Sequence, residues 1–206
     1  MPKVKVPRKS TVIDMTAMCD VASLLLTFFI LTATARQPEP LPVDTPSSTV
    51  KIKLPTTDIA TLTIGEGKVF FGVAGQPIRI RMLERMSERY KVPFTEEEKI
   101  RFSLMESFGV PIGNLKQLIN MDNKARNKAA QPGIPTDSVG ANASELREWI
   151  YNARVATKEI NDKELRISIK GDSEEQYPVV KKVIDILQSQ EVNKFSMITS
   201  LEGSDE

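Results

Sequence analysis

Histidine is missing from the 206-residue sequence, and cysteine occurs only once. Without histidine the chain cannot form a histidine-dependent catalytic triad or a histidine-ligated metal site. With Cys19 as its only cysteine, it cannot form an intramolecular disulfide or a C-x-x-C redox pair. Lysine and arginine number 28 against 27 aspartates and glutamates, and this near-neutral balance gives no basic footprint for nucleic acid. No nucleophile, base and metal set converges elsewhere, so we predict a protein that is not an enzyme and has no cofactor or metal.

One stretch of the chain is apolar enough to enter a membrane. Residues 15–35 read MTAMCDVASLLLTFFILTATA. As an α-helix at about 1.5 Å per residue they would span about 31 Å, close to the thickness of a bilayer's hydrocarbon core. We predict a transmembrane helix over residues 13–35. The excess of lysine and arginine in residues 1–12 predicts a cytoplasmic basic tail, with the chain after residue 35 on the other side of the membrane.

A cleaved signal peptide is the alternative interpretation of the same segment. A basic start, an apolar run and Ala33-Thr34-Ala35 as a cleavage site would all fit a secreted, soluble protein. The acids Asp14 and Asp20 argue against it, because signal peptides favour a basic region followed by an uncharged core. We therefore predict an uncleaved anchor.

Asp20 is the only charged residue between positions 15 and 35. A carboxylate at the centre of a span costs on the order of 2.5–3.5 kcal/mol on insertion scales, so such a residue usually has a function. Thr16, Ser23 and Thr27 are spaced to share its helical face, and we predict them as a supporting polar face. Their hydroxyls either bond to carbonyls of their own helix or bind another helix, and the sequence leaves both open.

A proline-rich stretch and a short strand follow the span. Residues 36–49 contain four prolines and favour an extended polyproline II conformation, so we predict a tether. Val50, Ile52 and Leu54 then alternate with lysines until Pro55, which is typical of a short strand. We predict that the edge of this strand binds a partner.

Strand and helix patterns alternate over residues 50–206 and predict an α/β (α+β) domain with a small mixed sheet. Residues 60–64 and 68–73 flank a glycine-containing turn and predict a hairpin. No phosphate-binding glycine motif is present in these segments.

Helical patterns follow the hairpin. Thr95 and Glu98 have the spacing of a capping box at the start of one helix. We predict that Ile100, Leu104 and Phe108 form the buried face of this helix.

The C-terminal third has a strand–helix–strand pattern. Residues 165–169 alternate as a half-buried strand, and we predict that Ser173 with Gln176 caps the following helix. A last strand is predicted near Phe195–Leu201.

The basic N-terminus, the helix IDMTAMCDVASLLLTFFIL, the proline tether and the segment LRISIKGDSEEQYPVVKKVIDIL together resemble the ExbD/TolR family. The resemblance covers residues 8–81 and 144–201, and residues 82–143 look like a long helical insertion. Asp20 matches the proton-carrying aspartate of the family, and Thr16 matches a threonine commonly found before it.

The resemblance implies a subunit of a proton-driven motor in the bacterial inner membrane, with residues 50–206 as a single periplasmic domain. The implied partners are an ExbB/TolQ-like polytopic ring protein, a second copy of the chain within the ring, membrane lipid and a TonB- or TolA-like energy transducer, and no nucleic acid. A membrane-anchored module that binds, for example, peptidoglycan without proton coupling is the alternative, and a replaceable Asp20 would indicate it.

Overall fold

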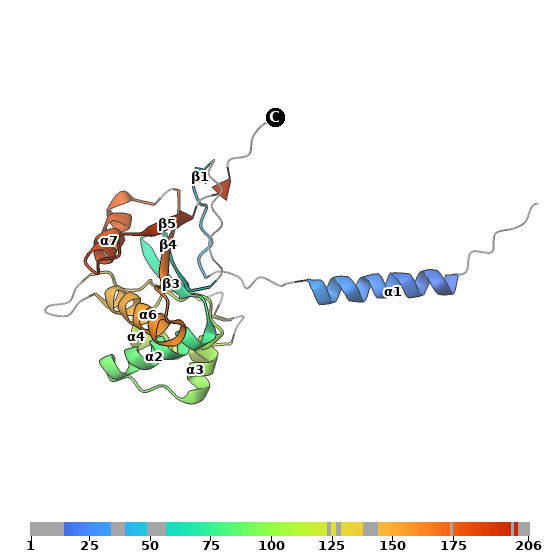
Figure 1. Cartoon of the computed structure of the whole chain (residues 1–206), viewed down its shortest axis with the longest axis horizontal. Coiled ribbons are helices and arrows are strands. Elements are labelled where there is room, and N and C mark those ends of the chain that lie inside the picture. Colours follow the sequence, from blue (N-terminus) through green and yellow to red (C-terminus); the bar gives the residue numbers. More distant parts are fainter. Residues whose placement is uncertain are drawn as a thin grey trace, which may run out of the picture. The chain divides into compact units, whose positions relative to one another are not determined.

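The computed structural model describes residues 15–33, 40–48, 57–122, 125–126, 129–137, 144–173, 175–198 and 200–201 (Figure 1). The chain divides into two compact units, Met1–Gln37 and Pro38–Glu206. The first unit contains α1 (Met15–Thr32), an 18-residue helix that is long and apolar enough to cross a membrane. Its described side chains are exposed.

The second unit is built on a mixed four-stranded sheet in the order β3-β2-β4-β5. Its strands are β2 (Ile59–Gly65), β3 (Lys68–Val73), β4 (Arg166–Gly171) and β5 (Phe195–Ile198). β2 pairs antiparallel with β3 and parallel with β4, and β4 pairs parallel with β5. A parallel partner requires a crossover connection, and helices supply it here. The predicted α+β class is confirmed.

The hairpin between β2 and β3 has a two-residue turn at Glu66 and Gly67. Both residues have positive φ, 52° and 69°. This is the signature of a type I′ turn, whose twist matches that of the flanking strands. The predicted hairpin is therefore confirmed.

Among the described residues, the helices that accompany the sheet are α2 (Gln76–Tyr90), α3 (Glu96–Ser103), α4 (Ile112–Asn120), α6 (Glu145–Asn161) and α7 (Tyr177–Gln188). The strand register places Ala60 beside Ile167 and Leu62 beside Ile169, so these buried side chains share one face of the sheet. They join residues of the helices in one hydrophobic cluster. The opposite face carries the alternate residues, among them Thr61 and Thr63.

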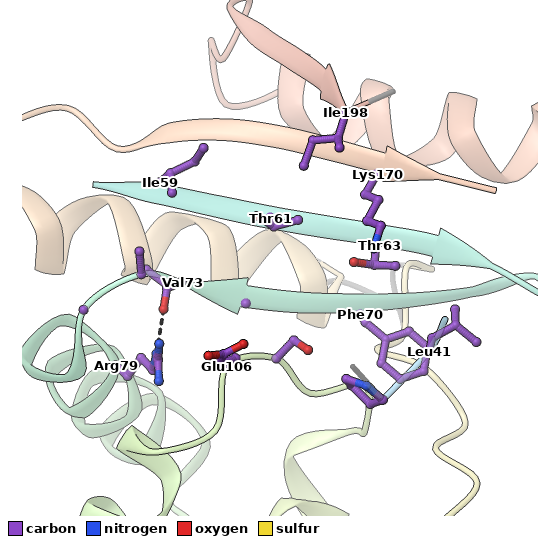
Figure 2. Close-up of a pocket in the computed structure, with 15 residues that line it drawn as sticks. Leu41, Ile59, Thr61, Thr63, Phe70, Val73, Arg79, Glu106, Lys170 and Ile198 are labelled. Atoms are coloured by element: carbon purple, nitrogen blue, oxygen red, sulfur yellow. Dashed lines mark hydrogen bonds between the residues drawn. The ribbon is translucent and has the colours of Figure 1, made fainter. Parts of the chain in front are cut away.

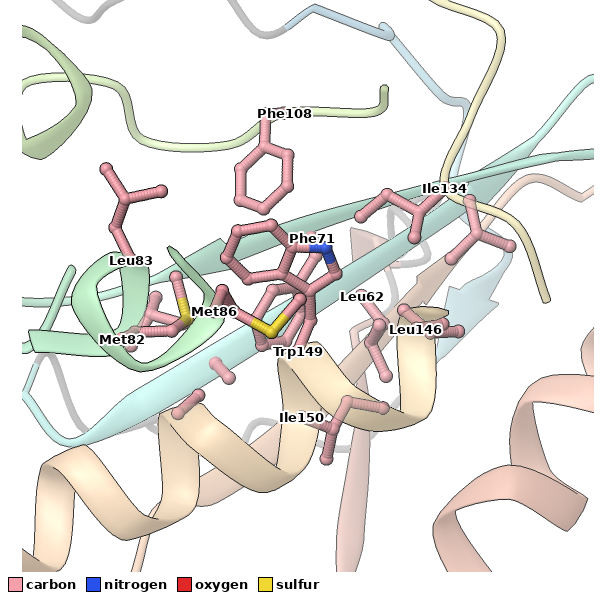
Figure 3. Packing of buried hydrophobic residues seen from close by; sticks show 14 of the residues in the cluster. Leu62, Phe71, Met82, Leu83, Met86, Phe108, Ile134, Leu146, Trp149 and Ile150 are labelled. Atoms are coloured by element: carbon pink, nitrogen blue, oxygen red, sulfur yellow. The ribbon is translucent and has the colours of Figure 1, made fainter. Parts of the chain in front are cut away.

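Trp149 of α6 lies at the centre of the core and is fully buried (Figure 3). Its ring centroid is 4.8 Å from that of Phe108 in an edge-on arrangement and 6.3 Å from that of Phe102, which stacks on it. Aromatic pairs of this kind contribute about 0.5–1.5 kcal/mol beyond their buried area. The cluster ties α3 and α6 to the sheet.

The predicted buried face of the helix that follows Thr95 is wrong. The capping box of Thr95 and Glu98 is present, but the helix ends at Ser103. Ile100 and Leu104 are exposed, at 58% and 50%, and the buried hydrophobic residue of this helix is Phe102. The helix ends before Phe108 because the backbone of Phe108 pairs with the sheet. It exchanges two hydrogen bonds with Phe71, at 2.8 and 3.0 Å, along the outer edge of β3.

The predicted cap of the last helix is also wrong. α7 begins at Tyr177 with Gln176 as its N-cap, and no side chain caps it. Pro178 in the first turn sets the start of the helix, because its fixed φ suits that position and its missing N–H is not needed there.

Candidate functional site

The polar face of α1 is the first candidate site. Asp20 is the only charged residue of this helix. Thr16, Ser23 and Thr27 lie four residues before it and three and seven residues after it, so the helix brings all four to one narrow face. The predicted site residues are therefore together on one helix, and their role remains a prediction.

The hydroxyl of Thr27 is satisfied within α1. Its Oγ1 donates to the carbonyl of Leu24 at 2.9 Å, and Thr32 does the same to Phe28 at 2.8 Å. For Thr27 this confirms the alternative in which a hydroxyl bonds to its own helix. Asp20 cannot bond to its own helix in this way. An ionised carboxylate only accepts hydrogen bonds, and the backbone N–H groups inside a helix already donate to backbone carbonyls.

The described part of the predicted tether, residues 40–48, lies against the folded domain, and we call it the strap. Leu41 of the strap is only 8% exposed. The strap passes directly over Gly65 at the end of β2. A Cβ at Gly65 would lie 2.8 Å from Cγ1 of Val43 and 3.0 Å from Cδ2 of Leu41, so the strap fits because this residue has no side chain.

Backbone hydrogen bonds also hold the strap. The amide of Ser173 donates to the carbonyl of Asp44 at 2.8 Å. At its end, β1 (Ser47–Ser48) pairs in parallel with β6 (Ser200–Leu201), which follows β5. The strap is thus joined to the domain at both the hairpin and the C-terminal strand. The predicted partner-binding edge, Val50, Ile52 and Leu54, lies outside the described residues.

A cavity of about 550 Å³ lies on the sheet face opposite the helical core (Figure 2). We call it the trough. Thr61 and Thr63 form part of its floor, Leu41 of the strap lies at one end, and Arg79 and Glu106 lie at the other. Sequence reasoning missed this site, because its residues come from six separate stretches of the chain with no common spacing.

The described residues contain no group of three or more histidine, cysteine, aspartate or glutamate side chains that could hold a metal ion. Glu175, in an acidic turn, has structural partners instead: its carboxylate accepts from the amides of Gly67 and Gln176, at 3.0 and 3.1 Å.

Comparison with known proteins identifies the family. A family model described as "Biopolymer transport protein ExbD/TolR" matches residues 7–202, nearly the whole chain and including the helices between residues 82 and 143. The chain therefore belongs to the ExbD/TolR family, whose members are membrane-anchored energy-transducing subunits of biopolymer transport. No curated protein and no solved structure matches the chain.

Proposed function

We propose that this member of the ExbD/TolR family is the proton-carrying subunit of a motor in the bacterial inner membrane. The motor would energise a TonB- or TolA-type transenvelope protein for outer-membrane transport. The observation that supports the proposal is the single carboxylate of α1, Asp20, on a face that it shares with Thr16, Ser23 and Thr27.

Asp20 requires a protein environment within the bilayer. An ionised carboxylate facing lipid would cost on the order of 2.5–3.5 kcal/mol, and such residues face a bundle interior or water. A ring of ExbB/TolQ-like subunits around two copies of α1 would supply both. Protonation removes the charge of Asp20 and changes its attraction to polar groups of the ring. Each proton transfer would then bias which ring subunit the helix approaches.

The orientation follows from the basic tail. We infer that residues 1–12 lie in the cytoplasm and residues 50–206 in the periplasm, because lysine and arginine are retained on the cytoplasmic side. Protease added to spheroplasts should digest the chain beyond residue 35 and spare the N-terminal end. A protein whose N-terminus is Arg36 would contradict the anchor and the motor together.

The decisive test is Asp20→Asn, with Thr32→Val as its matched control. Asparagine keeps the size and hydrogen bonding of Asp20 but carries no proton, so energy-dependent transport should fall to the level of a strain without the protein. Thr32→Val removes a hydroxyl that lies outside the predicted polar face and donates to the Phe28 carbonyl of its own helix, so transport should remain. Both variants should still co-purify with a polytopic ring protein. Full transport with Asp20→Asn would instead favour an anchored binding module.

The strand edge of Val50, Ile52 and Leu54 is proposed as the surface that transmits the motion. A strand edge can exchange its main-chain partners, here a second copy or the TonB- or TolA-like transducer, at little net cost. Ile52→Pro removes one amide donor and fixes the backbone at this position. Assembly with the ring protein should survive and transport should fail. Normal transport at a normal protein level would show that this edge is only part of a linker.

A further inference from the structure

The trough lies between two segments that pack against the sheet. One is the strap, which contributes Leu41, and the other contains Glu106 and Ser107. The second segment approaches the sheet closely: a Cβ at Gly72 would lie 2.3 Å from the carbonyl oxygen of Glu106. Between them the sheet face remains open over a volume of about 550 Å³ (Figure 2). Ligand sites typically have about 300–1,000 Å³.

Arg79 at one end of the trough differs from the other arginines of α2. Arg81, Arg85 and Arg89 each pair with a glutamate, at 2.7–2.8 Å. Arg79 instead donates through Nε to the carbonyl of Val73 and through Nη1 to that of Ser103, both at 2.6 Å. Among the described residues, no carboxylate lies within ion-pair distance of its guanidinium.

The two carbonyls fix the guanidinium but do not neutralise it. Arg79 is half-buried, and burial lowers the pKa of its guanidinium. Glu106 acts in the opposite direction from a longer distance, and its side chain is exposed. The Nη2 group has no acceptor among the described residues, so part of the guanidinium can still donate hydrogen bonds to a ligand. A half-buried cation in this state favours a carboxylate partner, because a carboxylate neutralises the charge and its two oxygens match the planar guanidinium.

The rest of the trough suits an extended peptide. Its floor and walls combine apolar side chains with threonine hydroxyls; they include Ile59, Thr61, Thr63, Phe70 and Val73. The ionisable side chains that line it are Arg79, Lys170 and Glu106, which leaves one net positive charge. One extended segment of the chain, the strap, already docks beside this sheet face, and its Leu41 lines one end of the trough.

We propose that the trough binds an extended segment of a partner protein that carries an acidic side chain, with the carboxylate on Arg79 and an adjacent apolar side chain on the sheet face. Glu106 competes with the ligand for Arg79 and repels its charge. The assignment uses only the periplasmic domain and does not depend on proton transfer at Asp20, so either proposal can fail alone.

The test is a selection of random displayed heptapeptides on the full-length chain in nanodiscs, with empty nanodiscs as counter-selection. We expect enrichment of peptides that hold aspartate or glutamate next to an apolar residue. A synthetic copy of one such peptide should bind at least about tenfold more tightly than the same peptide with its acid replaced by the amide, the loss expected for a bond to a charged group.

Variants then locate the binding site. Arg79→Lys should weaken binding of the acidic peptide, and Glu106→Gln, an exposed substitution that leaves both Arg79 bonds intact, should strengthen it. Glu88→Gln makes the same charge change at an exposed position of α2 outside the trough, and should leave binding unchanged. The fluorescence of Trp149, the sole tryptophan, verifies folding of each variant.

Three results would overturn the proposal. They are a selection that yields no peptides, selected peptides without acidic residues, or equal effects of Glu106→Gln and Glu88→Gln on the affinity. Loss of transport in Asp20→Asn with unchanged peptide binding would show that the two sites are independent.

Discussion

Replacing Gly65 by alanine should release the strap from the domain. The new methyl group would lie 2.8 Å from Cγ1 of Val43, a separation that requires a shift, and 3.0 Å from Cδ2 of Leu41, so these two side chains of the strap must move. Because the strap is a separate segment on the surface of the sheet, it can relieve the overlap by leaving, while the core keeps its packing. The free energy lost is then limited to what docking of the strap contributes.

The structure gives the size of that contribution. Burial of Leu41, which is 8% exposed, is worth about 1.5–3 kcal/mol. The hydrogen bond from the Ser173 amide to the Asp44 carbonyl adds about 0.5–1.5 kcal/mol. We therefore expect Gly65→Ala to weaken docking of the strap by about 2–4 kcal/mol. At about 1.4 kcal/mol per factor of ten, exchange of the Ser173 amide hydrogen should accelerate by about 30-fold or more.

The assay is hydrogen exchange at Ser173, with Gly171→Ala as the control. Gly171 ends β4 beside Ile64, and a Cβ there would meet no atom within 4 Å. This substitution should leave Ser173 protected and, by restricting the unfolded chain, change stability by only about 0.4–1 kcal/mol in the favourable direction. Equal exchange at Ser173 in Gly65→Ala and Gly171→Ala would refute docking of the strap on Gly65.

Three further predictions concern the stability of the domain, measured by denaturant unfolding with Trp149 fluorescence. Burial raises the pKa of the Glu145 carboxyl, whose Oε1 accepts from the Ile112 amide and the Trp149 indole. Because the pKa of Glu145 is raised in the folded state, its contribution to stability falls as pH rises above the ordinary value of 4.5. Glu145→Gln should therefore be more stable than the original chain at neutral pH and should lose this advantage in acid. A stability difference that does not change with pH would contradict this. Thr95→Ala removes the N-cap of α3 and should cost about 1 kcal/mol, whereas no change would mean that the capping box contributes nothing. Glu66→Asn places a residue suited to positive φ in the hairpin turn and should stabilise by about 0.5–1 kcal/mol, and a loss would show that the ion pair of Glu66 with its neighbouring lysine matters more than the backbone.

Local patterns predicted the regular elements well. The hairpin, the helix that begins after Thr95 and the strand–helix–strand at the C-terminus are all present, because each is set by a pattern within one segment. The predictions failed where a segment pairs with another that is distant in the sequence. Phe108 leaves the helical pattern to pair with Phe71, and Leu104 is therefore exposed.

The candidate sites divide in the same way. Sequence alone located Asp20 and its polar face. A charge inside an apolar span can be recognised from the order of residues, and a helix of 3.6 residues per turn fixes which residues share a face. Only the tertiary structure placed Leu41 over Gly65 and brought Arg79 and Glu106 together on the open face of the sheet. Those neighbours are joined by the folding of separate segments, and no local spacing encodes such contacts.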